Sequence, residues 1–486
     1  MVCALPELTG VWAETFPELS RPVVPRHAPA PRLLAANDEV AHDLALEPSA
    51  LRTEDGLRFL VGECRAPGAL PVAQVYAGHQ WGVFQPLLGD GRAALLGERR
   101  RRSGALADLH AKGIGPTSMS RVDGFATVGP MLREYLLGET MHALGLPTTR
   151  ALAVVATGSP RRLNGEVLPG AVLTRVAASH IRYGSFEYAA SLGDRALLHR
   201  LTAHALDRHY PHVTPGRYPA RALLDGVVGA AAAQTAGWMG VGFVHGVLST
   251  DNVLVSGETI DYGPCAFLDV YDPDAVFSSI DLHGRYAFRR QPEIMRWNLA
   301  RLGDALAEIL AEDLDAGRAV ADEIVATFDR RYRDAWTAVF RAKLGLGSSV
   351  PPSVVQTLAD EILSLLAAHR VDYTVLWRDL AAAARGDGAA VRGAFPDGAA
   401  PDLGAWLERW WAQKPDAVHM AAANPAYVPR NHLVDEALAA AIAGDLGPFD
   451  ELVTVLRDPF VERDTDLGRR LAAAPTPAPF VTFCGT

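Results

Sequence analysis

The sequence predicts an α+β fold made of two lobes. Strand-like apolar runs lie early in the chain, mainly between residues 71 and 176, whereas helical periodicity dominates from residue 297 to about residue 384. Separate blocks of strands and helices are typical of α+β proteins. A third observation is a polar loop between apolar runs, centred near residue 250, which lies between the two blocks.

Composition limits the class of protein and its partners. The 486 residues are enough for two or three lobes with substantial cores, and the net charge of −10 argues against nonspecific binding to nucleic acid. The run 99–102 consists of four arginines, but it is short and isolated, so we expect a solvated loop between strands.

The hydropathy and cysteine patterns predict the cellular location. Residues 227–244 are uncharged but contain several glycines and Gln234, which favours a buried helix over a membrane span. The amino-terminal residues lack a signal-peptide pattern, and the four cysteines have the spacing of neither a disulfide framework nor a zinc site. We expect a cytoplasmic protein without membrane or nucleic-acid partners, with a monomer as the simplest assembly.

The order of the patterns predicts four regions. Residues 1–70 are rich in Pro and Arg and lack enough periodic apolar residues for a core, so they form an arm packed on the body. Residues 71–175 form the first lobe and residues 176–320 the core of the second. Residues 321–486 form a helical extension packed on that second lobe, with helices expected at 405–411 and 433–443.

The central loop indicates the chemistry. Residues 243–255 read as two short strands around a polar loop that carries His245, Asp251 and Asn252, and Asp261 follows in an Asp-Tyr-Gly turn. Protein kinases hold Mg²⁺ with a catalytic-loop Asn and the Asp of a similar turn, because Mg²⁺ prefers hard oxygen ligands. Asn252 and Asp261 fit these roles, which predicts a protein-kinase-like two-lobed fold with a metal and nucleotide site.

One position departs from the kinase pattern. The kinase loop places its catalytic base two residues after the His, where this chain has Val247, which cannot accept a proton. A carboxylate appears instead at Asp251, beside Asn252. The alternative is a simple Asp-Asn turn between two strands.

A glycine-rich segment precedes the first long strands. Gly89-Asp90-Gly91-Arg92 lies between strand-like runs, which by itself favours a plain hairpin. The alternative is a phosphate-binding loop, in which glycines let backbone N–H groups approach the phosphates.

A strand lysine and a helix glutamate form a second candidate pair. Lys112 ends the expected strand 108–113, and the next strong helix, 131–144, carries Glu134 and Glu139. Strand lysines that face nucleotide phosphates normally pair with such a glutamate, and we expect Glu134. The alternative is an exposed strand lysine.

Two arginines follow the next pair of strands. Strands are expected at 151–156 and 171–176, with a turn at 158–160. Arg175 and Arg182 lie at the end of the second strand, where guanidinium groups suit either phosphate oxygens or ion pairs with neighbouring acidic residues.

Taken together, these residues resemble one family closely. The resemblance covers nearly the whole chain. The matching motifs are Tyr76-Ala77-Gly78-His79-Gln80, Leu88-Gly89-Asp90-Gly91-Arg92, Ala111-Lys112-Gly113, Arg133-Glu134, Pro147-Thr148-Thr149-Arg150-Ala151, His245-Gly246-Val247, Thr250-Asp251-Asn252, Thr259-Ile260-Asp261-Tyr262-Gly263-Pro264, Asn424-Pro425 and Arg430-Asn431. The sequence resembles the selenoprotein O (YdiU-like) family of kinase-fold protein adenylyltransferases.

The resemblance implies a function and a set of site residues. AMP would pass from a flipped ATP to Ser, Thr or Tyr hydroxyls of protein substrates. Asp251 would accept the proton, Glu134 would orient Lys112, and Asn252 and Asp261 would bind Mg²⁺ or Mn²⁺. The nucleotide would be held by Gly89, Gly91, Arg92, Lys112, Asp123, Gly124, Arg175, Arg182 and Asp261. The segment around Asp123 departs from the family, because Phe125 replaces an Arg.

Many family members end in a Cys or selenocysteine just before two small residues, as Cys484 does here. The resemblance suggests a reversible disulfide between Cys265 and Cys484, and the alternative is two reduced thiols. Two other functions compete with adenylyl transfer: ordinary γ-phosphate transfer, against which Val247 argues, and a pseudokinase scaffold that only binds ATP.

Overall fold

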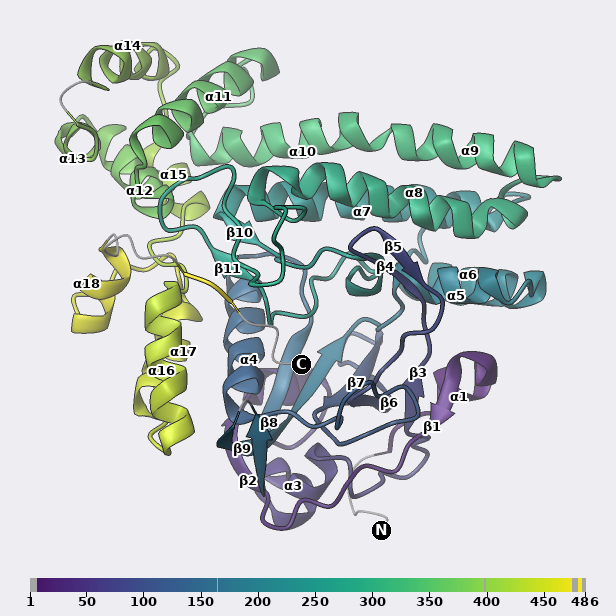
Figure 1. The fold of residues 1–486 in the computed structure, drawn as a ribbon. Helices are drawn as coiled ribbons and strands as arrows, with labels where there is room; N and C mark the ends of the chain where they lie inside the picture. Colours follow the sequence, from purple (N-terminus) through teal and green to yellow (C-terminus); the bar gives the residue numbers. More distant parts are fainter. Residues whose placement is uncertain (1–6, 164, 397–398, 474–479, 483–486) are drawn as a thin grey trace.

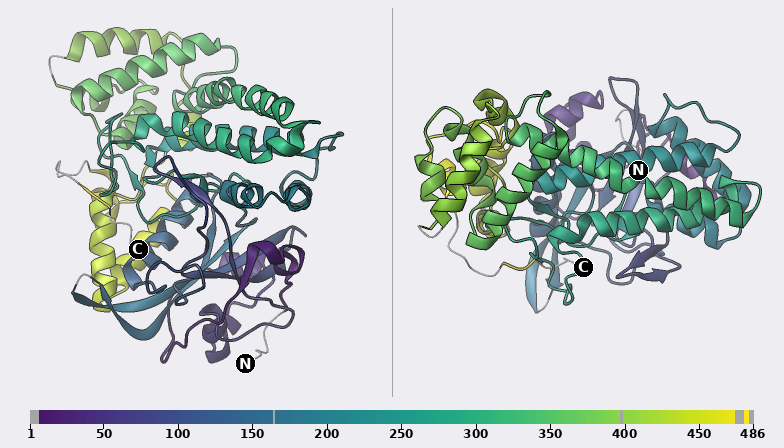
Figure 2. Two further views of the ribbon diagram at one scale, coloured as in Figure 1. Left: turned by 45° about the vertical axis from the view of Figure 1, so that its right-hand side comes forward. Right: turned by 90° about the horizontal axis from the view of Figure 1, so that it is seen from above.

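A computed structural model describes residues 7–163, 165–396, 399–473 and 480–482. It is a mixed α+β structure in which an amino-terminal antiparallel sheet is followed by a helical region (Figure 1). This confirms the expected α+β class. Figure 2 shows the helical region as a layer on one side of the sheet region.

The sheet has seven strands in the order β1-β3-β6-β7-β9-β8-β2, and every neighbouring pair is antiparallel. Its strands are β1 Ser20–Pro22, β2 Arg32–Ala36, β3 Val72–Gln74, β6 Ala93–Arg100, β7 Leu106–Lys112, β8 Arg150–Leu163 and β9 Glu166–Ala177. Both edge strands come from the first 70 residues. The arm is therefore anchored to the body at both edges of the sheet.

Each face of the sheet has its own core, because successive strand residues point to opposite faces. Leu173 of β9 packs with Met131 and Leu136 of helix α4 (Val128–Ala143). The neighbouring residue, Val172, belongs instead to the core that contains α2 (Asp38–Asp43) and α3 (Glu54–Leu60). Helix α4 thus carries Glu134 along the face that looks toward the helical region (Figure 1).

The helical region contains a layer of long helices, α7 to α10 (Figure 1). Their bounds are α7 Pro219–Val241, α8 Gln291–Leu310, α9 Leu314–Ala326 and α10 Phe328–Lys343. The expected buried helix at 227–244 is thus confirmed as part of α7. Among the described residues, no helix combines the length and apolar character needed to cross a membrane.

Helix α7 ends at Gly242, whose φ of 73° is left-handed, and a Cβ there would lie 2.8 Å from the ring of Tyr373. The chain then forms β10 (Phe243–Val244), which pairs with β11 (Ala266–Phe267). This short ribbon brackets the polar loop.

Further helices, strands and 3-10 turns lie among the described residues. They are α1 Val11–Thr15, α5 Tyr183–Ser191, α6 Arg195–His209, α11 Pro352–His369, α12 Tyr373–Ala383, α13 Ala389–Gly393, α14 Ala400–Trp411, α15 Ala417–Ala423, α16 Asn431–Ala443, α17 Gly447–Leu456 and α18 Asp466–Ala472, with strands β4 Gly78–Gln80 and β5 Val83–Gln85 and 3-10 turns η1 Pro17–Leu19, η2 Ala50–Arg52, η3 Thr250–Asn252 and η4 Phe288–Arg290.

The carboxy-terminal helices are tied to the segment that follows the Asp-Tyr-Gly turn. Arg430, which is fully buried, pairs with Asp269 at 3.1 Å and with Asp372 at 2.8 Å. Asn431 donates a hydrogen bond to the carbonyl of Phe267 at 3.0 Å. The Arg430-Asn431 motif therefore has a structural role, because it fixes the extension on β11.

Two local expectations were wrong, and a third was right in part. The turn at 158–160 is absent because β8 continues through it with an irregularity, and Pro160 lies opposite Pro169. Residues 253–255 form only an isolated bridge with Arg182 rather than a strand, since β10 takes β11 as its partner. Of the run 99–102, the first two arginines end β6 and the last two lie in the loop before β7.

Buried Lys343 leads to a prediction about stability. Its ammonium group lies 4.6 Å from the ring centre of Trp377, and burial lowers its pKa to about 7. The unfolded chain binds this proton up to about pH 10, so the free energy of unfolding should rise with pH above 7, by at most about 1.4 kcal/mol per pH unit.

Chemical denaturation between pH 7 and pH 9.5 measures this slope. Lys343→Met should remove this contribution, whereas the control Lys414→Met, at an exposed lysine, should retain it. An unchanged slope in Lys343→Met would contradict the assignment.

Candidate active site

A cavity of about 450 Å³ lies between the sheet and the helical region. Most of the predicted site residues line it, although they come from distant parts of the sequence. They are Gly89, Gly91, Arg92, Lys112, Arg175, Arg182, Asp251, Asn252 and Asp261. The lining contains five Lys or Arg side chains and three carboxylates, an excess of positive charge that suits a polyphosphate.

Lys112 lies at the centre of the charged groups. Its ammonium group is 2.6 Å from Glu134 Oε2 and 2.8 Å from Asp261 Oδ1, and the residue is only 6% exposed. The predicted contact with Glu134 is therefore present, and the alternative of an exposed lysine is wrong. Glu139 instead pairs with Arg150 at 2.7 Å.

The lysine controls the charge of its partners. Burial by itself would raise the pKa of Asp261, but Lys112 outweighs burial and lowers the pKa below its usual range. For Glu134, Lys112 and then Arg175 likewise outweigh burial and lower the pKa. Both carboxylates are therefore ionised at neutral pH.

The two predicted arginines line the cavity and also form ion pairs, so both of the roles considered for them are compatible with the geometry. Arg175 Nη1 lies 2.9 Å from Glu134 Oε1. Arg182 Nη2 lies 3.6 Å from Asp90 Oδ1, and its Nη1 donates to the backbone carbonyl of Asp251 at 2.6 Å. Arg182 is thus fixed against the polar loop that carries Asp251 before any substrate binds.

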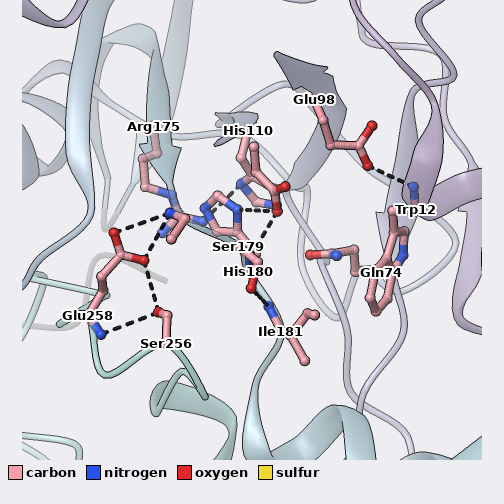
Figure 3. Close-up of polar contacts among 12 residues, drawn as sticks. Trp12, Gln74, Glu98, His110, Arg175, Ser179, His180, Ile181, Ser256 and Glu258 are labelled. Atoms are coloured by element: carbon pink, nitrogen blue, oxygen red, sulfur yellow. Dashed lines mark hydrogen bonds and ion pairs between the residues drawn. The ribbon is translucent and has the colours of Figure 1, made fainter. Parts of the chain in front are cut away.

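A buried histidine pair supports this arrangement from behind the cavity (Figure 3). His110 lies 2.9 Å from Asp90 Oδ2 through Nε2 and 3.0 Å from Arg175 Nη2 through Nδ1, and its ring stacks on His180 at 4.3 Å. Burial lowers the pKa of both histidines, which keeps them neutral. His110 therefore accepts at Nδ1 and donates at Nε2.

Asp90 and His110 were not predicted as site residues. A signal for His110 was present, because it lies two residues before Lys112 on the same strand and therefore on the same face. Asp90 could be found only from the fold, since its partners lie on β3 and β7 and in the segment before α5.

The glycine-rich segment is a loop, and the expected hairpin is wrong. The flanking strands do not pair with each other: β5 pairs with β4, and β6 pairs with β3 and β7. The Asp90 side chain accepts a hydrogen bond from Gln74 N at 3.0 Å, and the Asp90 carbonyl accepts one from Thr117 Oγ1 at 2.7 Å. Ser120 bonds the carbonyl of Gly91. The loop is therefore held in shape from both sides.

Asp123 and Gly124 do not line this cavity. The side chain of Asp123 accepts a hydrogen bond from Phe125 N at 3.1 Å, and its neighbours Arg121 and Val122 line the cavity instead. A nucleotide contact for Asp123 and Gly124 stays a prediction.

Strand β4 holds the polar loop at Thr250 and Asp251, a contact that the sequence did not reveal. Gln80 Nε2 donates to Asp251 Oδ2 at 2.8 Å, and His79 N donates to Thr250 Oγ1 at 2.7 Å. At Gly78, a Cβ would lie 2.8 Å from Asp251, so only glycine permits this approach. Asp251 Oδ1 is buried without a hydrogen-bond partner among the described residues, which leaves it free to accept a proton.

Glu187 of α5 joins the same contact. Its Oε2 accepts a hydrogen bond from Thr250 at 2.8 Å, and its Oε1 lies 2.8 Å from His79 Nδ1. His245 has a structural role: it is buried, and its Nε2 lies 3.1 Å from the carbonyl of Ile260. Burial lowers its pKa, so the neutral ring donates this hydrogen bond.

The donor groups of Asn252 and Asp261 fit a hard divalent cation. Asn252 Nδ2 donates to the carbonyl of Val247 at 3.1 Å, which leaves its side-chain oxygen available, and Asp261 supplies an ionised carboxylate. The described residues contain no cluster of three or more His, Cys, Asp or Glu that could hold a metal alone. Phosphate oxygens would therefore have to complete the shell.

Cys265 is a buried free thiol that donates to the carbonyl of Tyr262 at 3.2 Å, and burial raises its pKa to about 12. Cys484 lies outside the described residues. The nearest described part of the tail, Thr482, donates to the carbonyl of Pro264 at 2.7 Å.

Comparison with known proteins identifies the class of the protein. Residues 8–457 match the model of the family described as protein adenylyltransferase SelO, and the chain belongs to this family. The expected resemblance is thus confirmed. The family is one of nucleotidyltransferase enzymes.

Individual relatives agree over the full length. The chain is 52% identical over 483 residues to protein nucleotidyltransferase YdiU of Mycobacterium sp. (strain KMS), covering 99% of each chain. It is 51% identical to the protein of the same name from Pseudarthrobacter chlorophenolicus, covering 99% of this chain and 98% of the relative. A Cereibacter sphaeroides relative is 51% identical, covering 94% of this chain and 95% of its own.

The Gln80 contact leads to a prediction. Gln80→Leu keeps a similar volume but removes the amide that orients Asp251. We expect kcat to fall roughly tenfold to a hundredfold, because a hydrogen bond to a charged group contributes about 1.5–3 kcal/mol. The KM for ATP should stay nearly constant. Steady-state kinetics with Gln85→Leu, on the paired strand, as the control would test this, and a change confined to KM would contradict it.

Proposed function

We propose that this chain is a protein adenylyltransferase that transfers AMP from ATP to Ser, Thr or Tyr hydroxyls of proteins and releases pyrophosphate. The observation that carries the proposal is the pair Val247 and Asp251. Both residues line the cavity, but only Asp251 can accept a proton. The kinase position for the base is thus apolar, whereas a carboxylate with an unpartnered oxygen lies four residues further on.

The cationic side chains that line the cavity suit the triphosphate of ATP. Lys112, Arg175 and Arg182 line one cavity, with Arg92 and the Gly89–Gly91 backbone beside them. We assign the β- and γ-phosphates to these groups, with the nucleotide flipped relative to kinases so that the α-phosphorus faces Asp251. Arginine forks and a lysine would stabilise the charge that develops on pyrophosphate as it leaves.

Adenylyl transfer would then be a single displacement at the α-phosphorus. The acceptor hydroxyl oxygen attacks the α-phosphorus, its proton passes to Asp251, and the bond from the α-phosphorus to the bridging oxygen breaks. Gln80 and Arg182 keep Asp251 in position. Glu134 keeps Lys112 in place. Mg²⁺ or Mn²⁺ held by Asn252 and Asp261 would neutralise phosphate charge when bound.

The fold and partners belong to the same proposal. The Lys112–Glu134 pair, the Asn252 and Asp261 positions and the sheet-then-helices order all support a kinase-like two-lobed architecture, with the four regions bounded at residues 70, 175 and 320. We infer protein substrates from the family, and we infer a monomer in the cytoplasm as the working state.

An assay with labelled ATP separates the three candidate functions. Protein-bound label should come from α-labelled and not from γ-labelled ATP. Asp261→Ala should abolish it, since Asp261 contacts Lys112 and we assign it to the metal. Asp315→Ala, at an exposed carboxylate, is the control. Protein-bound label from γ-labelled ATP would indicate an ordinary kinase. If neither labelled ATP gives protein-bound label and no pyrophosphate is released, a pseudokinase scaffold is the remaining function.

The predicted redox bridge between Cys265 and Cys484 also stays a proposal. It is supported by the tail contact, because Thr482 bonds Pro264, the residue before Cys265. Under mild oxidant, non-reducing mass spectrometry should detect a linked peptide pair that Cys265→Ser removes. Free thiols at both positions after oxidation would refute the bridge.

A further inference from the structure

Two segments that line the cavity, at Trp81 and at Ile280, carry exposed apolar side chains. We call this set the mouth patch, and it consists of Trp81, Val83, Phe84, Leu87, Ile280 and Leu282. Val83 is 61% exposed and Leu282 is 84% exposed, which is unusual for large aliphatic residues in a monomer when they lie together. The mouth patch spans two separate segments, so a local sequence pattern alone does not explain it.

Contacts between the two segments make the mouth patch one surface. Trp81 packs on Tyr286 with ring centres 4.9 Å apart, and Trp81 N donates a hydrogen bond to the Tyr286 hydroxyl oxygen at 3.3 Å. Asp281 accepts hydrogen bonds from the backbone of Arg285 and Tyr286, at 2.9 and 2.8 Å, which folds this segment into a compact turn. The β4–β5 ribbon therefore contacts the 281–286 turn through Trp81 and Tyr286.

The mouth patch is continuous with the proposed reaction centre. Trp81 and Ile280 line the same cavity as Asp251, and Gln80, the neighbour of Trp81, bonds the Asp251 carboxylate. Because the ribbon and the turn contact each other, a polypeptide that presents a hydroxyl to Asp251 would approach over the surface that they share. The mouth patch is thus on the path of the acceptor.

We propose that the mouth patch docks the segment of the protein substrate that flanks the acceptor hydroxyl, and that it selects substrates with large apolar residues there. This inference rests on the proposed function and adds a substrate class to it. The ribbon from residue 81 to residue 88 contains no charged side chain, and the turn carries one carboxylate and one guanidinium, Asp281 and Arg285, so net charge favours neither an acidic nor a basic segment. Apolar area on both sides of the mouth matches an extended chain with apolar side chains next to the hydroxyl.

Two peptides test the selection. Both carry one Ser and have equal length and charge, but the residues beside the Ser are Leu and Phe in one and Gln and Asn in the other. With α-labelled ATP, the wild-type enzyme should use the apolar peptide with at least about tenfold higher kcat/KM, because burying one or two such side chains contributes that much. The difference should appear mainly in KM.

Val83→Asp combined with Leu282→Asp should remove this preference and leave the Kd for ATP, measured with Mn²⁺, unchanged. Both side chains are exposed, so the variant should fold. The matched control is Val167→Asp combined with Val418→Asp, at positions 61% and 80% exposed, which should keep the preference.

The outcomes separate the two proposals. Equal use of the peptides by the wild type, or a preference that survives in the double variant, overturns the docking inference. The inference is also overturned if the double variant has a lower mass than the wild type in light scattering but keeps the wild-type peptide preference. That result would assign the mouth patch to contact between two copies of the chain. Transfer to a protein acceptor without transfer to either peptide also overturns it. Absence of any transfer of α-label overturns the proposed function and this inference together.

Discussion

The ion pairs of Lys112 are the constraint on which the rest of the site depends. From Asp261 the chain of contacts runs through Lys112, Glu134 and Arg175 to His110, with each step shorter than about 3 Å. Buried charges are tolerated only when they are paired, and removing one partner of such a pair typically costs about 3–5 kcal/mol. These buried ion pairs therefore fix the positions of four elements relative to one another: strands β7 and β9, helix α4 and the Asp-Tyr-Gly turn.

The same network prepares the cavity for its substrate. Lys112 holds Asp261 ionised, and the neutral His110 joins Arg175 to Asp90 without adding a charge. Arg182 then connects Asp90 to the backbone of the catalytic loop. Much of the ordering of these groups is thus complete before a nucleotide binds, and pre-organised groups of this kind stabilise developing charge most effectively.

The sequence predicted those parts of the site that depend on local pattern. The kinase-like order of a strand lysine before a helix glutamate led to the expected Lys112–Glu134 pair, and the kinase-like spacing around residue 250 led to Asn252 and Asp261 as neighbours in one site. Strand pairing was harder to predict from the sequence. The hairpin at residues 89–92 was wrong because β5 pairs with β4, whereas β6 pairs with β3 and with the next strand, β7, and the local pattern around residues 89–92 does not encode this choice of partners.

Several contacts that the sequence missed join the sheet region to later segments of the chain. Gln80 and His79 reach the catalytic loop across about 170 positions in the chain, and Asp90 meets Arg182 in the same way. No periodicity in either segment encodes such a contact. Gly78 carried the nearest signal, since a glycine before two polar residues permits close approach of another chain segment.

We propose that the α-phosphorus, and not the γ-phosphorus, faces Asp251. A crystal structure with a non-hydrolysable ATP analogue and Mn²⁺ would show which phosphorus lies there. We expect the α-phosphorus nearest the Asp251 carboxylate, with the β- and γ-phosphates against Lys112, Arg175 and Arg182. A γ-phosphorus beside Asp251, with the α-phosphate on the far side of Lys112, would contradict it.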